Sequence, residues 1–332
     1  MNKNEITICV VLGGTSPERA VSKQSGKSLY NAVKKLGYNV RIVDPAYGLN
    51  QPQNIEDYFA ECDCGILSNE NYINAVNSSL FDNVDLVLIA LHGKWGEDGT
   101  IQSLFELKGI KYTGSGVLGS SLTMDKARSK VMFTHFGVST PKWIEAKKNI
   151  SIEELDKQIT ENLNYPCIIK PNDQGSTLGL TKCNSKNELA DAFELASQFS
   201  NTILIEEFIE GREISVGIIH DQILPLLEIK PKHELYDYEC KYTDGMSEYI
   251  VPANIDVEIE AEVKKQAKLA FESLGCKDYG RIDFRVTDQG VPYCFEVNTL
   301  PGMTSHSLVP KMAKASGIEF EELVDLIIES SL

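Results

Sequence analysis

The first third of the chain alternates short apolar runs with longer segments of helical pattern. Residues 6–12 and 39–43 are apolar and β-rich, and residues 18–36 between them have the spacing of an amphipathic helix. The unbroken apolar run over residues 84–91 is typical of a strand buried on both faces of a parallel sheet. We therefore predict a doubly wound α/β domain over residues 1–114, with ligands at the carboxyl ends of its strands.

The rest of the chain has the pattern of antiparallel hairpins packed against helices. Residues 143–146 and 167–170 predict short strands on either side of a polar helix. Residues 213–219 and 222–229 predict a hairpin. Residues 258–274 predict a helix with a single apolar stripe. This mixture is typical of an α+β arrangement.

A capping box marks the start of one further helix. Ser185 and Glu188 have the spacing at which each side chain bonds the other residue's backbone N–H, and the helix should run to Ser197. These elements divide the remainder of the chain into a central unit over residues 115–206 and a C-terminal unit over residues 207–332.

Composition and charge exclude several classes of function. The chain has 332 residues, 42% hydrophobic and 24% charged, the balance of a soluble globular protein. No apolar run reaches the roughly 18 residues of a membrane span, and the N-terminus shows no secretory signal. The eight cysteines include no Cys-x-x-Cys pair, which indicates reduced thiols. Because a net charge of −16 repels phosphate backbones, we expect no nucleic-acid partner. The thiols and the missing span and signal predict a cytoplasmic protein without a membrane partner.

Two C-terminal segments predict an acidic hairpin. If the turn centres on residues 289–290, Arg281 lies opposite Asn298 and Asp283 lies opposite Glu296. Residues two apart on a strand share a face, so the four polar side chains would form one patch. A surface hairpin with a solvated charged face would give the same pattern, although the opposite face of this hairpin is apolar.

The chemistry of that patch is typical of phosphoryl transfer. Asp283 and Glu296 offer carboxylates and Asn298 an amide oxygen, the ligands that Mg²⁺ prefers. Arg281 would hold a phosphate or a developing oxyanion. The loop over residues 299–304 follows directly and has backbone amides to donate.

Three lysines are candidates for contact with phosphates. Lys126 stands near a helix start, Lys170 ends a strand before a glycine-bearing loop, and Lys241 lies in a polar aromatic segment that could close over a ligand. The loop over residues 172–179 lacks a Walker sequence, and by itself an ordinary turn explains it equally well. Glu206 ends an apolar strand, where it suits an adenine or a ribose, or is merely a charge at a strand end.

The N-terminal part contributes a second set of polar residues. His92 opens the glycine-rich segment 92–99 directly after a buried strand, where it suits a general base, an anion partner or a capping imidazole in a tight turn. Glu18 begins a helix and suits either the helix dipole or a substrate ammonium group. Since Gly-x-Gly-x-x-Gly is missing after the first strand, a dinucleotide-binding dehydrogenase is disfavoured.

Together these motifs resemble one family, the D-alanine–D-alanine ligases of the ATP-grasp superfamily. The resemblance implies a two-part ATP-grasp fold after the N-terminal domain, with the lid in the central unit. It covers almost the whole chain and keeps the motifs in order: Gly13-Gly14 with Glu18, His92 to Gln102, Met124-Asp125-Lys126, Lys170-Pro171 with Gly175-Ser176, Glu206-Glu207, Tyr236 to Tyr242, Arg281-Ile282-Asp283, and Glu296 to Leu308.

The resemblance also implies a role for each matching residue. The metal ligands would be Asp283, Glu296 and Asn298. The ATP contacts would be Lys126, Lys170, Lys241, Glu206, Phe208, Ile209 and Glu213. The residues around the reacting groups would be Glu18, His92, Ser176, Tyr242, Arg281 and Gly302. A hydrogen bond between Ser176 and Tyr242 would close the lid. The carboxylate of the second substrate would meet Ser307 and Leu308.

The implied reaction is ATP-dependent ligation of two D-alanines through an acyl phosphate, for peptidoglycan precursor synthesis. The implied cofactors are ATP and two Mg²⁺, with Mn²⁺ as an alternative ion, and the implied assembly is a homodimer. D-Serine as the second substrate is an open alternative. D-Lactate is disfavoured by Tyr242, which ligases preferring a hydroxy acid lack in a matching loop.

The sequence departs from the pattern of the resembled family at a few positions. Ala20 replaces a usual glutamate, Trp95 is bulky where glycine or alanine is common, and Thr177 begins the pair that replaces Ser-Val. Arg285 takes a position that is usually apolar. None of these departures removes a proposed catalytic group.

Overall fold

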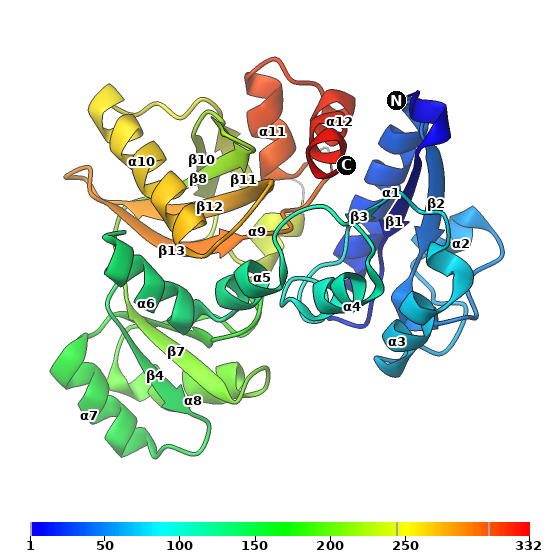
Figure 1. Ribbon diagram of the computed structural model, residues 1–332. Coiled ribbons are helices and arrows are strands. Elements are labelled where there is room, and N and C mark those ends of the chain that lie inside the picture. Colours follow the sequence, from blue (N-terminus) through cyan, green and yellow to red (C-terminus); the bar gives the residue numbers. More distant parts are fainter. Residues whose placement is uncertain (1, 244, 305) are drawn as a thin grey trace.

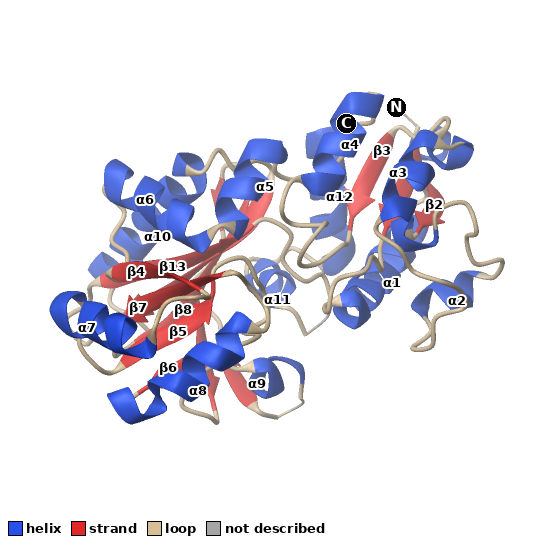
Figure 2. Cartoon of the chain, turned by 90° about the horizontal axis from the view of Figure 1, so that it is seen from below, coloured by secondary structure: helices blue, strands red, loops and turns tan. Residues whose placement is uncertain are grey.

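The computed structural model describes residues 2–243, 245–304 and 306–332, and for residues 238 and 242 it describes the backbone alone. Three sheets make up the fold, and Figure 1 shows them as separate lobes. In Figure 2 the N-terminal sheet stands apart, while the strands of the other two sheets overlap in the view. Each sheet has helices packed against it. The functional residues gather where the lobes meet.

The N-terminal lobe is a parallel sheet of the predicted kind. β1 (Thr7–Val11) is central between β2 (Asn39–Val43) and β3 (Leu86–Ile89), and both pairings are parallel. The predicted first helix is confirmed as α1 (Arg19–Lys35). The remaining helices of this lobe are α2 (Ile55–Phe59), α3 (Glu70–Asn77) and α4 (Thr100–Lys108).

The second sheet is antiparallel and has the order β4-β7-β5-β6. Its core contains Ile159, Ile169, Leu189 and Ile205, which are fully buried. Its strands are β4 (Trp143–Lys147), β5 (Cys167–Pro171), β6 (Thr181–Cys183) and β7 (Thr202–Glu207). The helices on it are α7 (Ile152–Asn162) and α8 (Lys186–Ser197).

The capping box predicted at the start of α8 is wrong. Ser185 is the N-cap residue, but its side chain makes no capping hydrogen bond. The Glu188 carboxylate instead accepts from the backbone N–H of Asn184 at 2.8 Å. The glutamate therefore reaches one residue further back and ties down the turn after β6.

The third sheet carries the predicted acidic hairpin. Its order is β11-β10-β8-β12-β13, and β9 also pairs with β8. Its strands are β8 (Arg212–Ile219), β9 (Gln222–Ile223), β10 (Leu227–Pro231), β11 (Ser247–Ile250), β12 (Tyr279–Val286) and β13 (Pro292–Asn298). One face packs on the apolar stripe of α10 (Val257–Ser273), as the sequence predicts. The other face is partly covered by α11 (Leu308–Ala315), and the rest of it lines the functional site.

Two helices connect the N-terminal lobe to the second sheet and pack against β13 of the third sheet. α5 (Val117–Met124) and α6 (Lys126–Phe136) lead from α4 into the second sheet. Asp125 caps α6 by accepting from the backbone N–H of Arg128 at 3.0 Å. This cap fixes Lys126 at the first turn of α6, beside the site.

The last helix returns to the start of the chain. α12 (Phe320–Ser331) follows α11 (Leu308–Ala315) and packs its apolar face on α1 and β3, in one core with Leu29 and Val10. Figure 1 shows red α12 beside blue α1. Tyr38 donates to Asp325 at 2.8 Å across this contact. The contact brings the loop before α11 close to the carboxyl ends of the N-terminal strands.

Among the described residues, no helix is both long enough and apolar enough to cross a bilayer.

Candidate active site

Two adjoining cavities lie on the face of the third sheet opposite α10. The first extends between the second and third sheets. The second extends toward the N-terminal lobe and reaches Glu18 and His92. Their common wall includes Lys126, Tyr236, Lys241, Arg281, Glu296 and Leu308. A ligand that fills both cavities must pass the four charged side chains of this wall, Lys126, Lys241, Arg281 and Glu296.

The β12–β13 hairpin forms the floor with the register predicted from the sequence. Arg281 pairs with Asn298, and Asp283 pairs with Glu296. Arg281 donates to Asp283 from Nε at 2.9 Å and from Nη2 at 2.8 Å. Ser215 donates from the neighbouring strand to Asp283 at 2.6 Å. The four polar side chains therefore do form one patch, at the boundary of the two cavities.

Lysines surround the Glu296 carboxylate. Lys126 Nζ lies 3.7 Å from its Oε2. Burial opposes ionisation of Glu296, but Lys126, Lys241 and Lys170 outweigh it and lower its pKa. Burial in turn lowers the pKa of Lys241. Glu296 is thus an ionised carboxylate within a cluster of cations that suits a polyphosphate.

A buried ion triad closes the far end of the first cavity. Glu206 lies between two ammonium groups, with Lys130 Nζ at 2.8 Å and Lys170 Nζ at 2.6 Å. Lys130 is fully buried and also donates to Thr140 at 2.8 Å. Burial opposes ionisation of Glu206, but the two lysines outweigh it and lower its pKa. Apolar walls between this triad and the hairpin include Ile168, Leu178, Phe208, Ile209 and Phe295.

Glu213 lies on the side of the first cavity and pairs with one of the unusual residues. Arg285 Nη2 is 2.9 Å from Glu213 Oε2. Burial raises the pKa of Glu213, and Arg285 is the main influence that opposes this rise. The arginine that departs from the family's pattern therefore faces the site.

Glu18 is the main acidic group of the second cavity. It precedes α1 and is 7% exposed. Its Oε1 accepts a hydrogen bond from Ser176 of the loop after β5. A Cβ atom on Gly175 would lie 2.9 Å from Glu18 Oε2, so the loop approaches as closely as only glycine allows. Burial and the neighbouring Glu97 raise the pKa of Glu18.

His92 is buried behind Glu18. Its Nε2 lies 3.1 Å from Ser25 Oγ, and its Nδ1 lies 3.9 Å from Glu97 Oε1. Burial opposes the charged form of His92, but Glu97 and Glu18 outweigh it and raise its pKa. The imidazole therefore bridges α1 and the glycine-rich segment, and lines the second cavity.

The loop before α11 forms the remaining wall of the second cavity. Ser307 accepts from the backbone N–H of Thr304 at 3.0 Å. Met303 donates its backbone N–H to Ser25 at 3.3 Å, which ties this loop to α1. Gly302, Ser307 and Leu308 all line the cavity.

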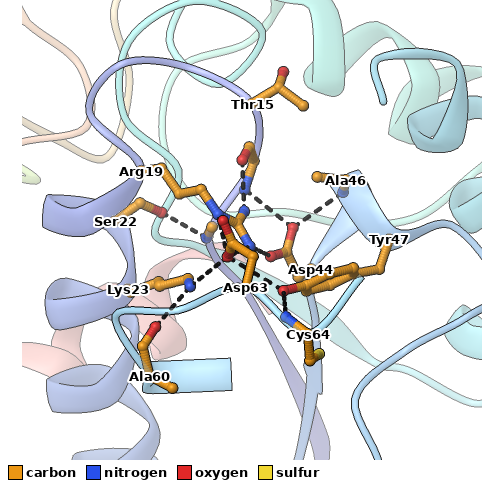
Figure 3. A network of polar contacts seen from close by, with 12 residues as sticks. Thr15, Arg19, Ser22, Lys23, Asp44, Ala46, Tyr47, Ala60, Asp63 and Cys64 are labelled. Atoms are coloured by element: carbon orange, nitrogen blue, oxygen red, sulfur yellow. Dashed lines mark hydrogen bonds and ion pairs between the residues drawn. The ribbon is translucent and has the colours of Figure 1, made fainter. Parts of the chain in front are cut away.

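An ionic network holds the loop that carries Glu18 (Figure 3). Arg19 Nη2 lies 2.7 Å from Asp44 Oδ2 and 2.8 Å from Asp63 Oδ1. Asp44 also accepts from the backbone N–H of Gly14 at 3.0 Å. A Cβ atom on Gly13 would lie 2.2 Å from Asp44, so this position requires glycine. The network fixes the turn between β1 and α1, and with it the position of Glu18.

The structure brings together every predicted residue whose side chain it describes. The predicted ATP contacts line the first cavity, and the residues predicted around the amino acids line the second. Tyr242 lies in α9 (Tyr238–Tyr242), but its side chain is outside the described residues. Its predicted hydrogen bond with Ser176 therefore stays a prediction.

Sequence reasoning missed three residues around the site. Lys130 carries a signal, because it lies four residues after Lys126 and so on the same face of α6. Glu97 lies within the glycine-rich segment opened by His92. Asp44 follows β2, at the carboxyl end where ligands of parallel sheets bind. None of these sequence features points to the site until the side chain that the residue contacts is known.

Two family models match the chain. One is described as D-ala D-ala ligase N-terminus and matches residues 7–115. The other is described as D-ala D-ala ligase C-terminus and matches residues 132–329.

Relatives with sequence similarity cover nearly the whole chain. A D-alanine–D-alanine ligase of Nitrosospira multiformis is 40% identical over 96% of this chain and 94% of its own length. One of Haemophilus influenzae is 40% identical over 97% of this chain and 100% of its own.

Solved structures are similar over the same length. A D-alanine–D-alanine ligase of Bacillus anthracis complexed with ATP is 34% identical with a TM-score of 0.77, covering 98% of this chain and 96% of its own. The VanG D-Ala:D-Ser ligase of Enterococcus faecalis is 32% identical with a TM-score of 0.82, covering 98% of this chain and 99% of its own.

Proposed function

The chain belongs to the D-alanine–D-alanine ligase family, and from that premise we propose how its two cavities carry out the reaction. It is an ATP-dependent, ADP-forming ligase that joins two D-alanines into D-alanyl-D-alanine for peptidoglycan synthesis. The observation that carries the proposal is the β12–β13 patch at the boundary of the two cavities. A phosphate donor on one side meets a carboxylate acceptor on the other at this patch.

The first cavity suits ATP, which the Bacillus anthracis relative binds. Adenine would lie between the apolar walls, with Glu206 and Lys170 at its polar edge and Phe208 and Ile209 beside it. Glu213 would accept hydrogen bonds from the ribose. The three site lysines (Lys126, Lys170 and Lys241) would hold the phosphates as point charges.

The donor set on the hairpin fits a magnesium ion. Asp283, Glu296 and Asn298 supply only oxygen ligands, and Glu296 is ionised. We propose two Mg²⁺ here, with Mn²⁺ able to replace them. When bound, these ions would neutralise the phosphates and polarise the transferred group.

The second cavity suits two amino acids. Glu18 would bind the ammonium group of the first D-alanine, with His92 behind it. Ser307 and the start of α11 at Leu308 would hold the carboxylate of the second. Both sites border the wall that contains Arg281, so each substrate can reach the reacting centre.

Two bond changes complete the reaction. A carboxylate oxygen of the first D-alanine attacks the γ-phosphorus of ATP, which releases ADP and leaves an acyl phosphate. The amine of the second D-alanine, after losing a proton, attacks the carbonyl carbon. Arg281 and the backbone N–H of Gly302 would stabilise the oxyanion of the tetrahedral intermediate before phosphate leaves.

Water must be kept away from the acyl phosphate. The loop after β5 already contacts Glu18 through Ser176 and contacts Lys126 through the Gln174 carbonyl at 2.8 Å. We propose that this loop and the segment with Lys241 and Tyr242 close together over the substrates. The proposed Ser176–Tyr242 hydrogen bond would fasten the closed form.

D-Serine is the second candidate for the attacking substrate. The similarity to a D-Ala:D-Ser ligase supports it, since one hydroxyl changes only the pocket near Leu308 and Tyr242. We favour D-alanine because the curated relatives carry that name. D-Lactate stays the least favoured on account of Tyr242.

We also propose the wider setting of the enzyme. The units would be residues 1–114, 115–206 and 207–332, a division supported by the strands of each sheet falling almost wholly within one unit. The enzyme would act in the cytoplasm as a homodimer, where its substrates ATP and D-alanine are available.

A product assay tests the proposed function. Purified protein is incubated with ATP, Mg²⁺ and D-alanine, alone and with D-serine or D-lactate, and the products are weighed by mass spectrometry. We expect D-alanyl-D-alanine and one phosphate per dipeptide. A larger yield of the D-alanyl-D-serine product in the mixed reaction would favour the second candidate, and no dipeptide with no phosphate would refute both.

A further inference from the structure

Arg285 and Glu213 form an ion pair that faces the first cavity. The two residues lie directly opposite each other on the adjacent strands β12 and β8. Arg285 Nη2 lies 2.9 Å from Glu213 Oε2, and Nη1 donates to the Gly211 carbonyl at 3.1 Å. Both side chains line the cavity, and both are largely buried. The Arg285 guanidinium is therefore held by two contacts, and the pair is accessible to a ligand in the cavity.

The pair occupies the row of the sheet next to the proposed metal ligands. Asp283 is two residues from Arg285 on the same face of β12, opposite Ser215 of β8. Two residues along a strand span about 7 Å. A nucleotide whose phosphates meet Asp283 therefore has its sugar beside Arg285 and Glu213 when its base lies between the apolar walls.

The arginine has hydrogen-bonding capacity to spare. A guanidinium carries five N–H groups in a fixed plane. Within the described part of the chain, its contacts to Glu213 and Gly211 use one N–H on each terminal nitrogen. The carboxylate of Glu213 likewise has a second oxygen for another donor. Together, the pair presents both an acceptor and donors to a ligand with hydroxyl groups.

We propose that Arg285 is a specificity-determining residue that, with Glu213, selects a ribonucleotide. This inference rests on the proposed use of ATP. Arg285 holds the Glu213 carboxylate in the orientation that accepts from the ribose hydroxyls and donates a remaining N–H to a hydroxyl oxygen. Since the pair acts on the sugar and not on the reacting phosphate, its removal affects nucleotide binding and leaves the chemical step intact.

A purely structural ion pair would behave differently, and the same sheet offers a matched example. Arg212 donates to Glu228 from Nε at 2.8 Å and from Nη2 at 2.7 Å, also across two strands. Neither of these residues lines either cavity. Arg212→Met therefore controls for the loss of a cross-strand arginine–glutamate pair without a change in the site.

The test compares ATP with 2′-deoxyATP and 3′-deoxyATP in the full-length protein. Dissociation constants are measured calorimetrically with Mg²⁺ and without D-alanine, and kcat and KM are measured in the ligase reaction. We expect the wild type to prefer ATP about tenfold over at least one deoxynucleotide, as for one charge-assisted hydrogen bond. Arg285→Met should weaken ATP binding about tenfold, reduce that preference to about twofold, and change kcat less than about twofold.

Two further variants sharpen the outcome. Arg285→Lys should keep part of the affinity but lose most of the sugar preference, because an ammonium group cannot hold Glu213 and a hydroxyl in one plane. Arg212→Met should bind all three nucleotides as the wild type does. If Arg285→Met does not fold, the same loss of preference in Arg285→Lys supports the proposal and an unchanged preference overturns it.

The failure of this inference is distinguishable from the failure of the proposed function. A wild type that binds Mg²⁺-ATP, with Arg285→Met showing unchanged affinity and preference, overturns the role of Arg285 and leaves the ligase assignment standing. A wild type that binds no ATP overturns the proposed function and this inference with it.

Discussion

Arg281 donates hydrogen bonds from two of its nitrogens to the carboxylate of Asp283, at 2.8 to 3.0 Å. The two residues share a face of β12, two positions apart. Asp283 is also a proposed metal ligand. The guanidinium therefore occupies a carboxylate that the proposed metal would need, and the two cations would compete for it.

This competition predicts the effect of removing the arginine. Arg281→Met should abolish turnover, because the oxyanion loses its cation, while Mn²⁺ binding without nucleotide should become about tenfold tighter. Electron paramagnetic resonance of free Mn²⁺ measures that affinity. Unchanged or weaker Mn²⁺ binding would show that the pair does not compete with a metal.

The loss of a proposed metal carboxylate predicts the opposite effect on Mn²⁺ binding. Glu296→Gln should lower phosphate release at least about 1,000-fold and weaken Mn²⁺ binding, because the substitution removes one of two charged ligands. Circular dichroism should show an intact fold. Glu272→Gln, on the exposed face of α10, is the control. Retained activity in Glu296→Gln would mean that the metal assignment is wrong.

The raised pKa of Glu18 predicts a pH dependence. Only the carboxylate attracts an ammonium group, so binding of the first D-alanine falls as the pH drops through this pKa. Because burial and Glu97 raise it, we expect the acid limb of kcat/KM for D-alanine above pH 4.5, the usual value for a glutamate. Glu18→Gln should lower kcat/KM at neutral pH and remove this limb. An unchanged limb in that variant would assign it to another group.

The close approach of Gly175 to Glu18 predicts that a methyl group is harmful there. Gly175→Ala places a Cβ atom 2.9 Å from Glu18 Oε2 and pushes the carboxylate away from the substrate. We expect kcat/KM for D-alanine to fall about tenfold with little change in melting temperature. Gly116→Ala is a suitable control because its Cβ would meet its nearest neighbours at 3.6 Å. Equal behaviour of the two variants would argue against a close-packed loop.

The Arg19–Asp44 pair predicts a loss of stability together with a loss of substrate binding. Asp44 is fully buried, and Asp44→Asn removes one of the two carboxylates that pair with Arg19, the other being Asp63, at a cost of about 2 kcal/mol. The turn before Glu18 loses its anchor as well, so KM for D-alanine should rise. Thermal unfolding and steady-state kinetics measure the two effects. The exposed pair of Lys35 and Glu321 offers the control Glu321→Gln, which should change neither. A stable Asp44→Asn enzyme with normal KM would contradict the role of the network.

The hairpin shows how far sequence reasoning reaches. Strand alternation and an assumed turn over residues 289–290 placed Arg281 opposite Asn298 and Asp283 opposite Glu296. Near the turn the strands pair one residue out of this register, with Phe284 opposite Cys294. A β-bulge between Asp283 and Phe284, which the sequence did not predict, restores the expected pairing at the patch. The choice of substrates did not follow from this geometry and required the resemblance to a family.

Contacts between distant segments could not be predicted in the same way. The triad of Lys130, Glu206 and Lys170 joins three elements, and no periodicity along one of them indicates the others. The packing of α12 on α1 could not be predicted either, because an apolar helix face does not indicate which element covers it. At α8, the glutamate of the predicted capping box accepts from the backbone N–H of Asn184, one residue before the predicted partner.

The central claim is that a carboxylate oxygen of D-alanine attacks the phosphate of ATP at the β12–β13 patch. D-Alanine labelled with ¹⁸O in its carboxylate tests this claim most directly, because the bridging oxygen of the acyl phosphate leaves with the phosphate. Mass spectrometry of the released phosphate should show one ¹⁸O for each dipeptide formed. Unlabelled phosphate accompanying dipeptide would contradict activation through an acyl phosphate.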